Sequence, residues 1–471
     1  MIVIEEKVTS MVSVANCISD KRKFFKCGKT LNVGFRIEQL KKLRKAILDN
    51  EEKISQALHN DLRKSKFEAY STEIGIVLAE IDDALAHIRS WVKPQKVSTP
   101  LIHFKASSAV YSDPYGVVLI ISPWNYPFQL LLAPLVGAIA AGNCSVLKPS
   151  EVASFTSTAI TEIIAQTFDP AYIVSIEGDA QTTQELLKHK FDYLFFTGGT
   201  EVGRIIYQAA AKFLTPVTLE LGGKSPCIVD EDIHLEYAAK RITWGKFVNC
   251  GQTCIAPDYL LVNKKVKPKL IAAIQKAIKE FYGEDPSKSI DFPRIINQRH
   301  FNRLKNYLGS GKIVTGGETK EADKYIAPTI LDNVTADSLI MQEEIFGPIL
   351  PILEYNTIEE AIQFINERPK PLALYVFSKN NAIVEQVLTQ TSSGGSCVND
   401  TVMHIANSQL RFGGVGDSGV GSYHGQFSFD TFSHRKSVFI KSNLIDIPLK
   451  YPPYSGETKF KLIKWLMEWF M

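Results

Sequence analysis

Apolar residues recur at helical spacing in two long segments near the amino terminus. Residues 36–65 and 71–92 each place them at intervals of three or four positions, and the second segment stops at the breaker Lys93–Pro94. We therefore expect two amphipathic helices there, each with one face against the rest of the protein. A polar connector over residues 93–108 separates them from a chain with a different pattern.

Beyond this connector, short apolar runs alternate with helical segments. The first set of runs is GVVLIISP, NCSVLKPS, YIVSIEG and FDYLFF, and a second set begins near Leu221 with SPCIVD, YLLVN, ILPILEY and LALYVFS. Such runs are typical of strands that are buried on both faces. Their alternation with helices predicts an α/β fold whose parallel sheets are covered by helices.

One late segment has the pattern of an exposed strand. Residues 434–442, HRKSVFIKS, are rich in β-formers and carry charges at both ends. Together with residues 108–117 they predict a protruding β-ribbon. Its open strand edges favour pairing with a partner chain.

Length, charge and cysteine content narrow the class of protein. A chain of 471 residues is too long for one ordinary core, so two or three structural units are expected. A net charge of +3 with scattered basic residues does not indicate nucleic-acid binding. Glu5 and Glu6 stand where a secretory signal needs other residues, and the apolar runs are too short to span a bilayer. Seven thinly spread cysteines indicate a reducing compartment, and we expect the cytoplasm.

Two motifs follow predicted strands at the edge where ligands bind parallel sheets. The glycines of FTGGTEVG (196–203) let backbone N–H groups approach a phosphate at a helix start, although the spacing is not GxGxxG and an ordinary glycine turn is the alternative. Lys148 and Glu151 in LKPSE are placed to meet a ribose or a phosphate, or else form a surface loop. Glu151 would repel a 2′-phosphate, which favours NAD over NADP.

Two further motifs are candidates for oxyanion and proton chemistry. In SPWNYPF (122–128), prolines hold the backbone around Asn125, whose amide can donate to a developing oxyanion. A proline-rich turn with a packed aromatic residue is the alternative. Glu220 in TLELGGKSP (218–226) ends an apolar strand, so a raised pKa would suit it as a general base. A structural glutamate that caps the next turn is the other interpretation.

Cys250 and Cys254 lie four positions apart in VNCGQTCIAP. A zinc site would need a second ligand pair, which is missing nearby, and a disulfide is disfavoured in a reducing compartment. The segment before Cys254 offers backbone donors near its sulfur, which favours a reactive thiolate. Cys250 follows a helical run and is expected to pack; a buried, inert role stays open for one of the two.

Together these motifs resemble those of the aldehyde dehydrogenase superfamily, in the order PWNYP (123–127), ELGGKSP (220–226), GQTC (251–254) and EEIFGP (343–348). The 34 positions between Glu220 and Cys254 are also similar to the family's spacing. The resemblance extends over roughly residues 15–445. PVTLELGGKSP, NCGQTCIAPDY, FGGVGDSGVGSYHG and FDTFSHRK resemble the class 3 and fatty aldehyde dehydrogenase branch.

This resemblance implies the α/β fold of aldehyde dehydrogenases. Its expected parts are a Rossmann-like NAD(P)-binding domain (1–100 and 118–220), an α/β catalytic domain (221–428), a small oligomerisation ribbon (101–117 and 429–446) and a tail helix (447–471).

The implied activity is NAD(P)-dependent oxidation of aldehydes to carboxylates, with NAD as cofactor, NADP as an accepted alternative and no metal. Cys254 would be the nucleophile that forms a thiohemiacetal and then a thioester. Asn125 would steady the oxyanion, and Glu220 would activate the hydrolytic water. The implied cofactor contacts are Trp124, Lys148, Glu151, Gly198, Gly199, Thr200, Glu201, Val202, Gly203, Leu221, Glu344 and Phe346.

Membership of the class 3-like branch would imply an apolar substrate: a medium- or long-chain aliphatic, or an aromatic, aldehyde. Tyr126, Trp244 and Ile405 are expected to line its tunnel, although all three also suit an ordinary core. A CoA-acylating aldehyde dehydrogenase and a catalytically inactive structural relative are the rival functions. The first would not need Glu220, and the second would not need an intact set of site residues.

The last residues form an aromatic segment with basic side chains. Residues 460–471 are too short and too charged to span a membrane, but as a helix they suit peripheral membrane contact through residues 456–471. Covering the mouth of a partner's active site and plain dimer packing are the alternatives. The resemblance implies a homodimer ahead of a tetramer, located in the cytoplasm or at a membrane surface.

Overall fold

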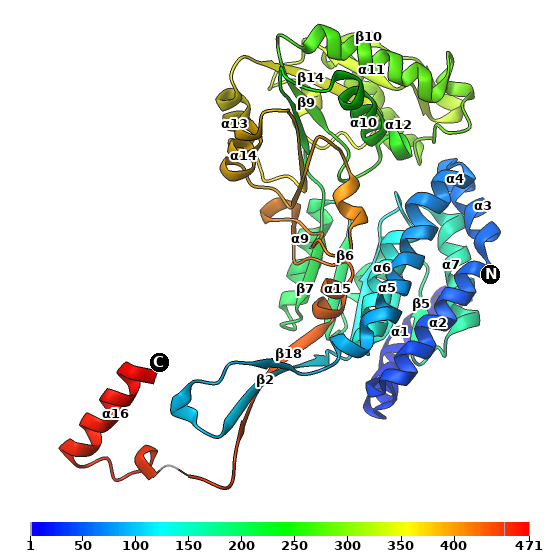
Figure 1. Cartoon of the computed structure of the whole chain (residues 1–471). Coiled ribbons are helices and arrows are strands. Elements are labelled where there is room, and N and C mark those ends of the chain that lie inside the picture. Colours follow the sequence, from blue (N-terminus) through cyan, green and yellow to red (C-terminus); the bar gives the residue numbers. More distant parts are fainter. Residues whose placement is uncertain (1, 447, 471) are drawn as a thin grey trace.

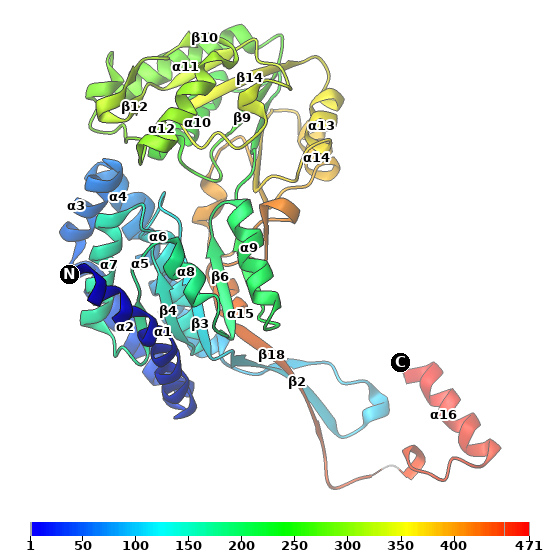
Figure 2. The ribbon, with the colours of Figure 1, turned by 180° about the vertical axis from the view of Figure 1, so that it is seen from behind.

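The computed structural model describes residues 2–446 and 448–470. Figure 1 shows two lobes, one above the other, with a long ribbon that projects from the lower lobe and ends beside the last helix. Figure 2, seen from behind, shows the same two lobes and the same projecting ribbon. The predicted α/β fold is confirmed.

Helices near the amino terminus cover one side of the lower lobe. The two predicted helices are observed as more pieces than expected, because the chain turns at Asn50 and because a π-helical turn over Tyr70–Ile74 precedes the second one. A first helix, α1, was not expected from the pattern. The bounds are α1 Ile2–Lys26, α2 Val33–Asp49, α3 Glu51–Leu62, α4 Lys66–Ala69 and α5 Gly75–Trp91.

The lower lobe is built on a six-stranded sheet in the order β17-β7-β6-β3-β4-β5. All neighbours are parallel except β17, which pairs antiparallel with β7. Every residue of β3 and β4 is buried, as their apolar runs predicted. The strands are β3 Val117–Ile121, β4 Cys144–Lys148, β5 Ile173–Ser175, β6 Tyr193–Thr197, β7 Val217–Glu220 and β17 Gly419–Val420; the helices between them are α6 Gln129–Ala141, α7 Ser154–Thr167, α8 Ala180–Leu186 and α9 Thr200–Ala211.

The order of this sheet creates a switch point. From β3 the chain moves outward through β4 to β5, and then returns to the other side of β3 for β6 and β7. Crossover connections therefore leave in opposite directions between β3 and β6, which opens a crevice at the carboxyl ends of these strands. The candidate motifs follow β3, β4, β6 and β7, so the topology brings them to one edge.

The upper lobe holds a seven-stranded sheet in the order β10-β13-β14-β9-β8-β15-β16, parallel except for β10. A two-stranded ladder of β11 Thr319–Lys320 and β12 Tyr325–Ile326 lies outside it. The strands are β8 Pro226–Val229, β9 Tyr259–Asn263, β10 Lys312–Thr315, β13 Thr329–Asp332, β14 Ile349–Tyr355, β15 Ala373–Phe377 and β16 Gly395–Val398; the helices are α10 Leu235–Phe247, α11 Lys267–Tyr282, α12 Gln298–Tyr307, α13 Ile358–Asn366 and α14 Asn381–Gln390.

The predicted ribbon is present as a three-stranded sheet of β1 Gln95–Val97, β2 Ala106–Pro114 and β18 Ser433–Lys441. β2 and β18 pair antiparallel along their whole length, from Pro114 opposite Ser433 to Ala106 opposite Lys441. Helix α15, Gln426–Thr431, precedes β18, so the ribbon strand begins later than residue 429.

The tail helix α16 covers Glu457–Phe470, not the whole of 447–471, because prolines at 448, 452 and 453 lack the N–H groups that a helix needs. It lies beside residues 101–103 of the ribbon loop (Figures 1 and 2). The side chains of Trp469 and Phe470, and Met471 as a whole, lie outside the described residues. Among the residues that are described, no helix is both long enough and apolar enough to cross a membrane.

Candidate active site

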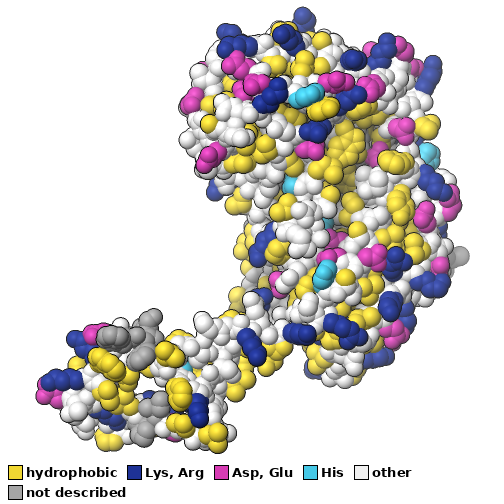
Figure 3. Space-filling model, viewed as in Figure 1, with side chains coloured by type: hydrophobic (Ala, Val, Ile, Leu, Met, Phe, Trp, Pro, Cys, Tyr) yellow, Lys and Arg dark blue, Asp and Glu magenta, His cyan; other side chains and the backbone are white. Residues whose placement is uncertain are grey.

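The segment that carries Cys254 meets the switch-point edge of the lower sheet. Hydrophobic side chains gather in a hollow between the two lobes (Figure 3). Three consecutive residues before the cysteine, Asn249, Cys250 and Gly251, have left-handed backbone with φ of 51°, 57° and 73°. A Cβ on Gly251 would lie 2.3 Å from the carbonyl oxygen of Gly347. The glycine of GQTC therefore packs directly against the glycine of EEIFGP.

Asn125 is hydrogen-bonded to the cysteine segment. Its side-chain amide donates to the carbonyl oxygen of Gln252 over 3.0 Å, and the amide is almost fully buried. The next residue, Tyr126, shares a hydrogen bond of 2.7 Å between its hydroxyl and that of Thr253. Two contacts thus join the loop after β3 to the residues just before Cys254.

Cys254 is partly exposed, whereas Cys250 is completely buried. Burial raises the pKa of the Cys250 thiol, as expected for an inert packing residue. Burial also raises the pKa of the Cys254 thiol, and the carboxylates of Glu344 and Glu220 add to this shift, while the backbone N–H groups of Cys254 and Ile255 oppose it. The structure therefore brings Cys254, Glu220 and Glu344 into one electrostatic site.

Glu220 ends β7 with 1% of its surface exposed, and neither carboxylate oxygen has a hydrogen-bond partner among the described residues. Burial raises its pKa well above that of an ordinary glutamate. A buried carboxyl without partners is costly unless a ligand or water meets it. Glu220 thus has both the environment and the free lone pairs of a general base.

Glu344 packs on the turn after β7. A Cβ on Gly222 would lie 2.1 Å from its Oε2. Burial raises the pKa of Glu344 to about 8, with a contribution from Asp258, while the N–H of Gly223 opposes the shift. Nearby, the rings of Trp124 and Phe346 meet edge to face with centroids 5.3 Å apart.

The glycine turn after β6 fits an anion. A Cβ added to Gly199 would have no atom within 4 Å, so open space lies at the first residues of α9. A Cβ on Gly203 would lie 2.5 Å from Leu221, so this glycine lets α9 pack closely on the sheet. Glu201 forms an ion pair with Arg204 over 2.6 Å, and the Thr200 hydroxyl donates to the Asp417 carbonyl oxygen over 3.4 Å. Val202 is exposed at the same helix start.

Lys148 and Glu151 lie at the end of β4. The Lys148 side chain is 1% exposed, and its Nζ lies 3.5 Å from Oε2 of the partly exposed Glu151. Its ammonium also donates to the Pro149 carbonyl over 2.7 Å. The open space at the first residues of α9 and this paired edge are compatible with the phosphate and ribose groups of a dinucleotide.

The expected tunnel residues are less tightly grouped. Tyr126 lies at the cysteine segment, Trp244 on α10 is 39% exposed, and Ile405 packs partly against the core. A Cβ on Gly245 would touch Thr401, so α10 and the segment before Ile405 are neighbours.

The hydrophobic pattern of the sequence did not reveal the buried polar residues that support the loop at Asn125 and the segment at Gln252. Lys64, Glu68, Glu73 and Asn249 are all buried and bonded to one another or to the loops at Asn125 and Gln252. Asn249, two residues before Gly251, could have been recognised, since asparagine tolerates left-handed backbone. Lys64 and Glu73 give no such signal, because charged residues at helix ends are ordinarily solvated.

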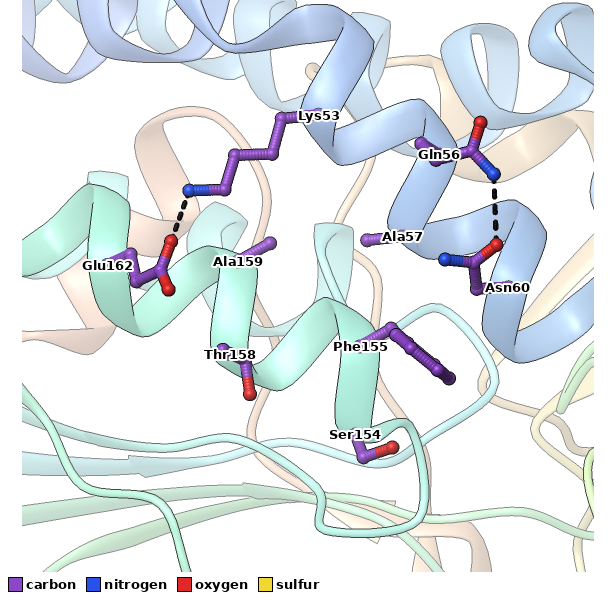
Figure 4. A pocket seen from close by; sticks show the side chains of 9 residues that line it. All are labelled: Lys53, Gln56, Ala57, Asn60, Ser154, Phe155, Thr158, Ala159 and Glu162. Atoms are coloured by element: carbon purple, nitrogen blue, oxygen red, sulfur yellow. Dashed lines mark hydrogen bonds and ion pairs between the residues drawn. The ribbon is translucent and has the colours of Figure 1, made fainter.

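A second hollow lies away from this site, between α3 and α7, with a volume of about 550 Å³. Figure 4 shows Lys53 of α3 reaching Glu162 of α7 across its rim, and Gln56 bonded to Asn60 over 2.9 Å. Its α7 wall includes Phe155, whose ring is exposed. None of the predicted site residues lines it.

Comparison with known proteins identifies the family of this chain. Residues 6–438 match the aldehyde dehydrogenase family. The 4,4'-diaponeurosporen-aldehyde dehydrogenase of Staphylococcus aureus (strain NCTC 8325 / PS 47) is 52% identical over 447 residues, or 94% of this chain and 97% of that protein. The dimeric, NADP-preferring aldehyde dehydrogenase of Rattus norvegicus is 47% identical over 445 residues, or 94% and 98%.

A solved structure, the substrate bound state of Staphylococcus aureus AldH, superposes with a TM-score of 0.95 at 51% identity. The match covers 96% of this chain and 99% of that one. Sequence, fold and the arrangement around Cys254 therefore agree: the chain belongs to the aldehyde dehydrogenase family and is an aldehyde dehydrogenase.

Proposed function

We propose that this enzyme oxidises apolar aldehydes through a covalent intermediate on Cys254, with Asn125 as oxyanion donor and Glu220 as the base for hydrolysis. The observation that carries the proposal is the shared environment of Cys254, Glu220 and Glu344, on a segment hydrogen-bonded to Asn125. A thiol nucleophile, a buried carboxylate as base and an amide donor are what acyl chemistry on a thiol requires.

The chemistry of the chain's own residues follows from these positions. The Cys254 thiol loses its proton to a water molecule, and the thiolate sulfur bonds to the aldehyde carbon. The carbonyl oxygen takes the electron pair and accepts hydrogen bonds from the Asn125 amide and the Cys254 N–H. A bound nicotinamide dinucleotide supplies the hydride acceptor. When the C–H bond breaks and the C=O bond re-forms, a thioester remains. Glu220 then takes a proton from water, the water oxygen bonds to the thioester carbon, and the C–S bond breaks to release the carboxylate.

The decisive experiment follows NADH absorbance when the protein is mixed with NAD and decanal. Cys254→Ser should abolish the signal, because an alcohol of ordinary pKa is a poor nucleophile without an activating base. Retained aldehyde oxidation in the Cys254→Ser variant would show that Cys254 is not the nucleophile. A parallel run with and without coenzyme A addresses the CoA-acylating rival: a rate that depends on coenzyme A would favour it.

We propose a long apolar or polyene aldehyde as the substrate class. The support is the family-typical site, the partly exposed aromatic faces of Tyr126 and Trp244, and a relative named for an aldehyde of the carotenoid type. Steady-state rates on hexanal, decanal, a retinal-like polyenal and succinic semialdehyde test it. Faster turnover of the charged semialdehyde would exclude this class.

For the cofactor we propose NAD as the preferred dinucleotide with NADP accepted. Glu151 beside buried Lys148 supports NAD, because a carboxylate repels the 2′-phosphate. The rat relative named as NADP-preferring supports acceptance of both. The ratio of kcat/KM for the two dinucleotides measures the preference.

The division of the chain into functional parts is also a proposal. Residues 1–100 and 118–220 would hold the dinucleotide, 221–428 the nucleophile, and 101–117 with 429–446 would join two copies into a homodimer. The open edges of the ribbon support its role in pairing. Deleting the ribbon loop and measuring mass in solution tests this, with a monomer as the expected product.

For residues 456–471 we propose peripheral contact with a membrane surface. α16 carries large apolar side chains beside Lys461 and Lys464, a combination that suits an anionic interface, and Figure 3 shows hydrophobic side chains gathered around α16 and the ribbon loop. Deletion of 456–471 should reduce sedimentation with anionic liposomes. Unchanged sedimentation with altered decanal selectivity would favour a cover over the partner's site instead, and no change in either would leave dimer packing. The exposed large side chains are Tyr454, Phe460, Leu462, Trp465 and Met467.

A further inference from the structure

A fully buried lysine lies directly beneath the proposed oxyanion donor. Lys64 stands between α3 and α4, and its side chain has no exposed surface. Its Nζ is 2.5 Å from Oε1 of Glu73 and donates over 3.2 Å to the backbone carbonyl oxygen of Asn125. It also lies 4.0 Å from the centroid of the Tyr126 ring. A buried ammonium is costly unless it is paired and bonded, and here both conditions are met.

The partner carboxylate, Glu73, binds the same loop at the end where α6 begins. Oε2 of Glu73 accepts hydrogen bonds from the N–H groups of Phe128 (2.9 Å) and Gln129 (3.2 Å), where α6 begins. Neither N–H has a partner within the helix, so Glu73 caps it. The Lys64–Glu73 pair therefore holds the short loop at Asn125 itself and at the end where α6 begins.

Asn249 is a second donor to the same carbonyl oxygen. Its Nδ2 donates to Asn125 O over 2.8 Å and to Gln252 O over 3.1 Å, and its own N–H donates to Glu68 over 2.9 Å. The carbonyl of Asn125 is thus clamped between Lys64 and Asn249. The side-chain amide of Asn125, in turn, donates a hydrogen bond to the carbonyl oxygen of Gln252.

We propose that Lys64, paired with Glu73 and acting together with Asn249, is a positioning residue for the oxyanion site. It fixes the peptide plane at Asn125, so that the side-chain amide is aimed at the oxygen of the carbonyl group that Cys254 attacks. Lys64 touches neither nucleophile nor substrate. The inference rests on the proposed function and extends it, because it says which buried pair sets the geometry of the donor.

The test variant exchanges the whole pair, Lys64→Met with Glu73→Gln. Lys64→Met alone would leave a buried carboxylate unpaired and destabilise the fold. In the double variant the new amide oxygen still accepts from Phe128 and Gln129, whereas the donor to Asn125 is gone. We expect kcat for decanal oxidation to fall about 10- to 100-fold, since a displacement of about 1 Å can cost about 100-fold. KM should change less than about threefold, because uniform binding is untouched.

Alkylation of Cys254 by iodoacetamide, followed by mass spectrometry of its peptide, separates positioning from general damage. In that displacement the charge develops on iodide and no oxyanion forms, so the rate should stay within about twofold of wild type although kcat falls. Lys53→Met with Glu162→Gln is the matched control. It removes the ion pair that joins α3 to α7 at the hollow of Figure 4, whose lining does not include Asn125, and it should leave kcat unchanged.

A wild-type kcat in the double variant would overturn the inference, and so would a parallel loss of Cys254 alkylation. If the double variant does not fold, Asn249→Gly decides. It keeps the left-handed backbone but removes the second donor to Asn125, so it should lower kcat about 10-fold with unchanged alkylation. An unchanged kcat there would also overturn the inference. Failure of the proposed function is distinct, because wild-type protein would then show no decanal oxidation at all.

Discussion

The side-chain amide of Asn125 donates to the carbonyl oxygen of Gln252 over 3.0 Å, two residues before Cys254. Asn125 follows a strand of the lower sheet and Cys254 follows a helix of the upper lobe, so this hydrogen bond joins the two lobes at the reacting centre. One amide hydrogen is used in this bond. We expect the other amide hydrogen to face the oxygen of a bound aldehyde.

Asn125→Ala should lower kcat of aldehyde oxidation by about 100- to 1,000-fold, the usual loss when one oxyanion donor is removed. Single-turnover NADH formation measures it, because that step contains the attack and hydride loss. Iodoacetamide labelling of Cys254 should proceed at the wild-type rate. A loss of labelling as large as the loss of turnover would show that Asn125 only supports the fold at Gln252.

Glu220→Gln should separate the two halves of the reaction. The first NADH equivalent should form rapidly, because the sulfur attack does not require Glu220. Steady-state turnover should fall about 100-fold or more, because hydrolysis of the thioester needs a water molecule that Glu220 activates. Stopped-flow absorbance resolves the burst from the slow phase. Loss of the burst itself would assign Glu220 to the first step instead.

The same variant makes a prediction about pH and stability. Burial raises the pKa of Glu220, so the folded protein binds this proton more tightly than the unfolded chain. The free energy of unfolding therefore falls as pH rises above the ordinary pKa of a glutamate, and Glu220→Gln removes that loss. The variant should be more stable than wild type at pH 8 and match it well below pH 4.5, by urea unfolding. Parallel curves at all pH values would contradict this.

Gly251→Ala should destabilise the protein by about 1–3 kcal/mol and abolish turnover. Its φ is 73°, and the added Cβ would lie 2.3 Å from the Gly347 carbonyl oxygen, so strain and overlap combine. Gly416→Ala is the control, since its φ of 67° is similar but its Cβ would meet nothing within 4 Å. Equal loss of stability in both variants would mean that strain alone matters at Gly251.

Glu151→Gln should raise the ratio of kcat/KM for NADP over NAD by about tenfold, because one charge that repels the 2′-phosphate is gone while the ribose can still be hydrogen-bonded. The comparison is made at low and at high salt. A ratio that does not change would place the 2′-position away from Glu151.

Much of the fold can be predicted from the order of apolar and polar residues. Buried parallel strands need uninterrupted apolar runs, and amphipathic helices need apolar residues with a period of 3.6. The runs at 117–121 and 193–197 became β3 and β6, as predicted. The break at Asn50 and the first helix α1 were not predicted. Helix boundaries depend on local capping and on tertiary contacts that a periodic pattern does not contain.

The family motifs around Cys254, Glu220 and Asn125 are determined by the sequence alone, because reactive groups and the glycines beside them must be particular residue types at particular places. Only the tertiary structure determined which buried polar residues support the loop that carries Asn125. Lys64, Glu73 and Asn249 come from segments far apart in the chain and meet only after the helices pack on the loops. In the sequence, a charged residue that becomes buried cannot be distinguished from an ordinary surface residue, because its desolvation and its ion-pair partner arise only on folding.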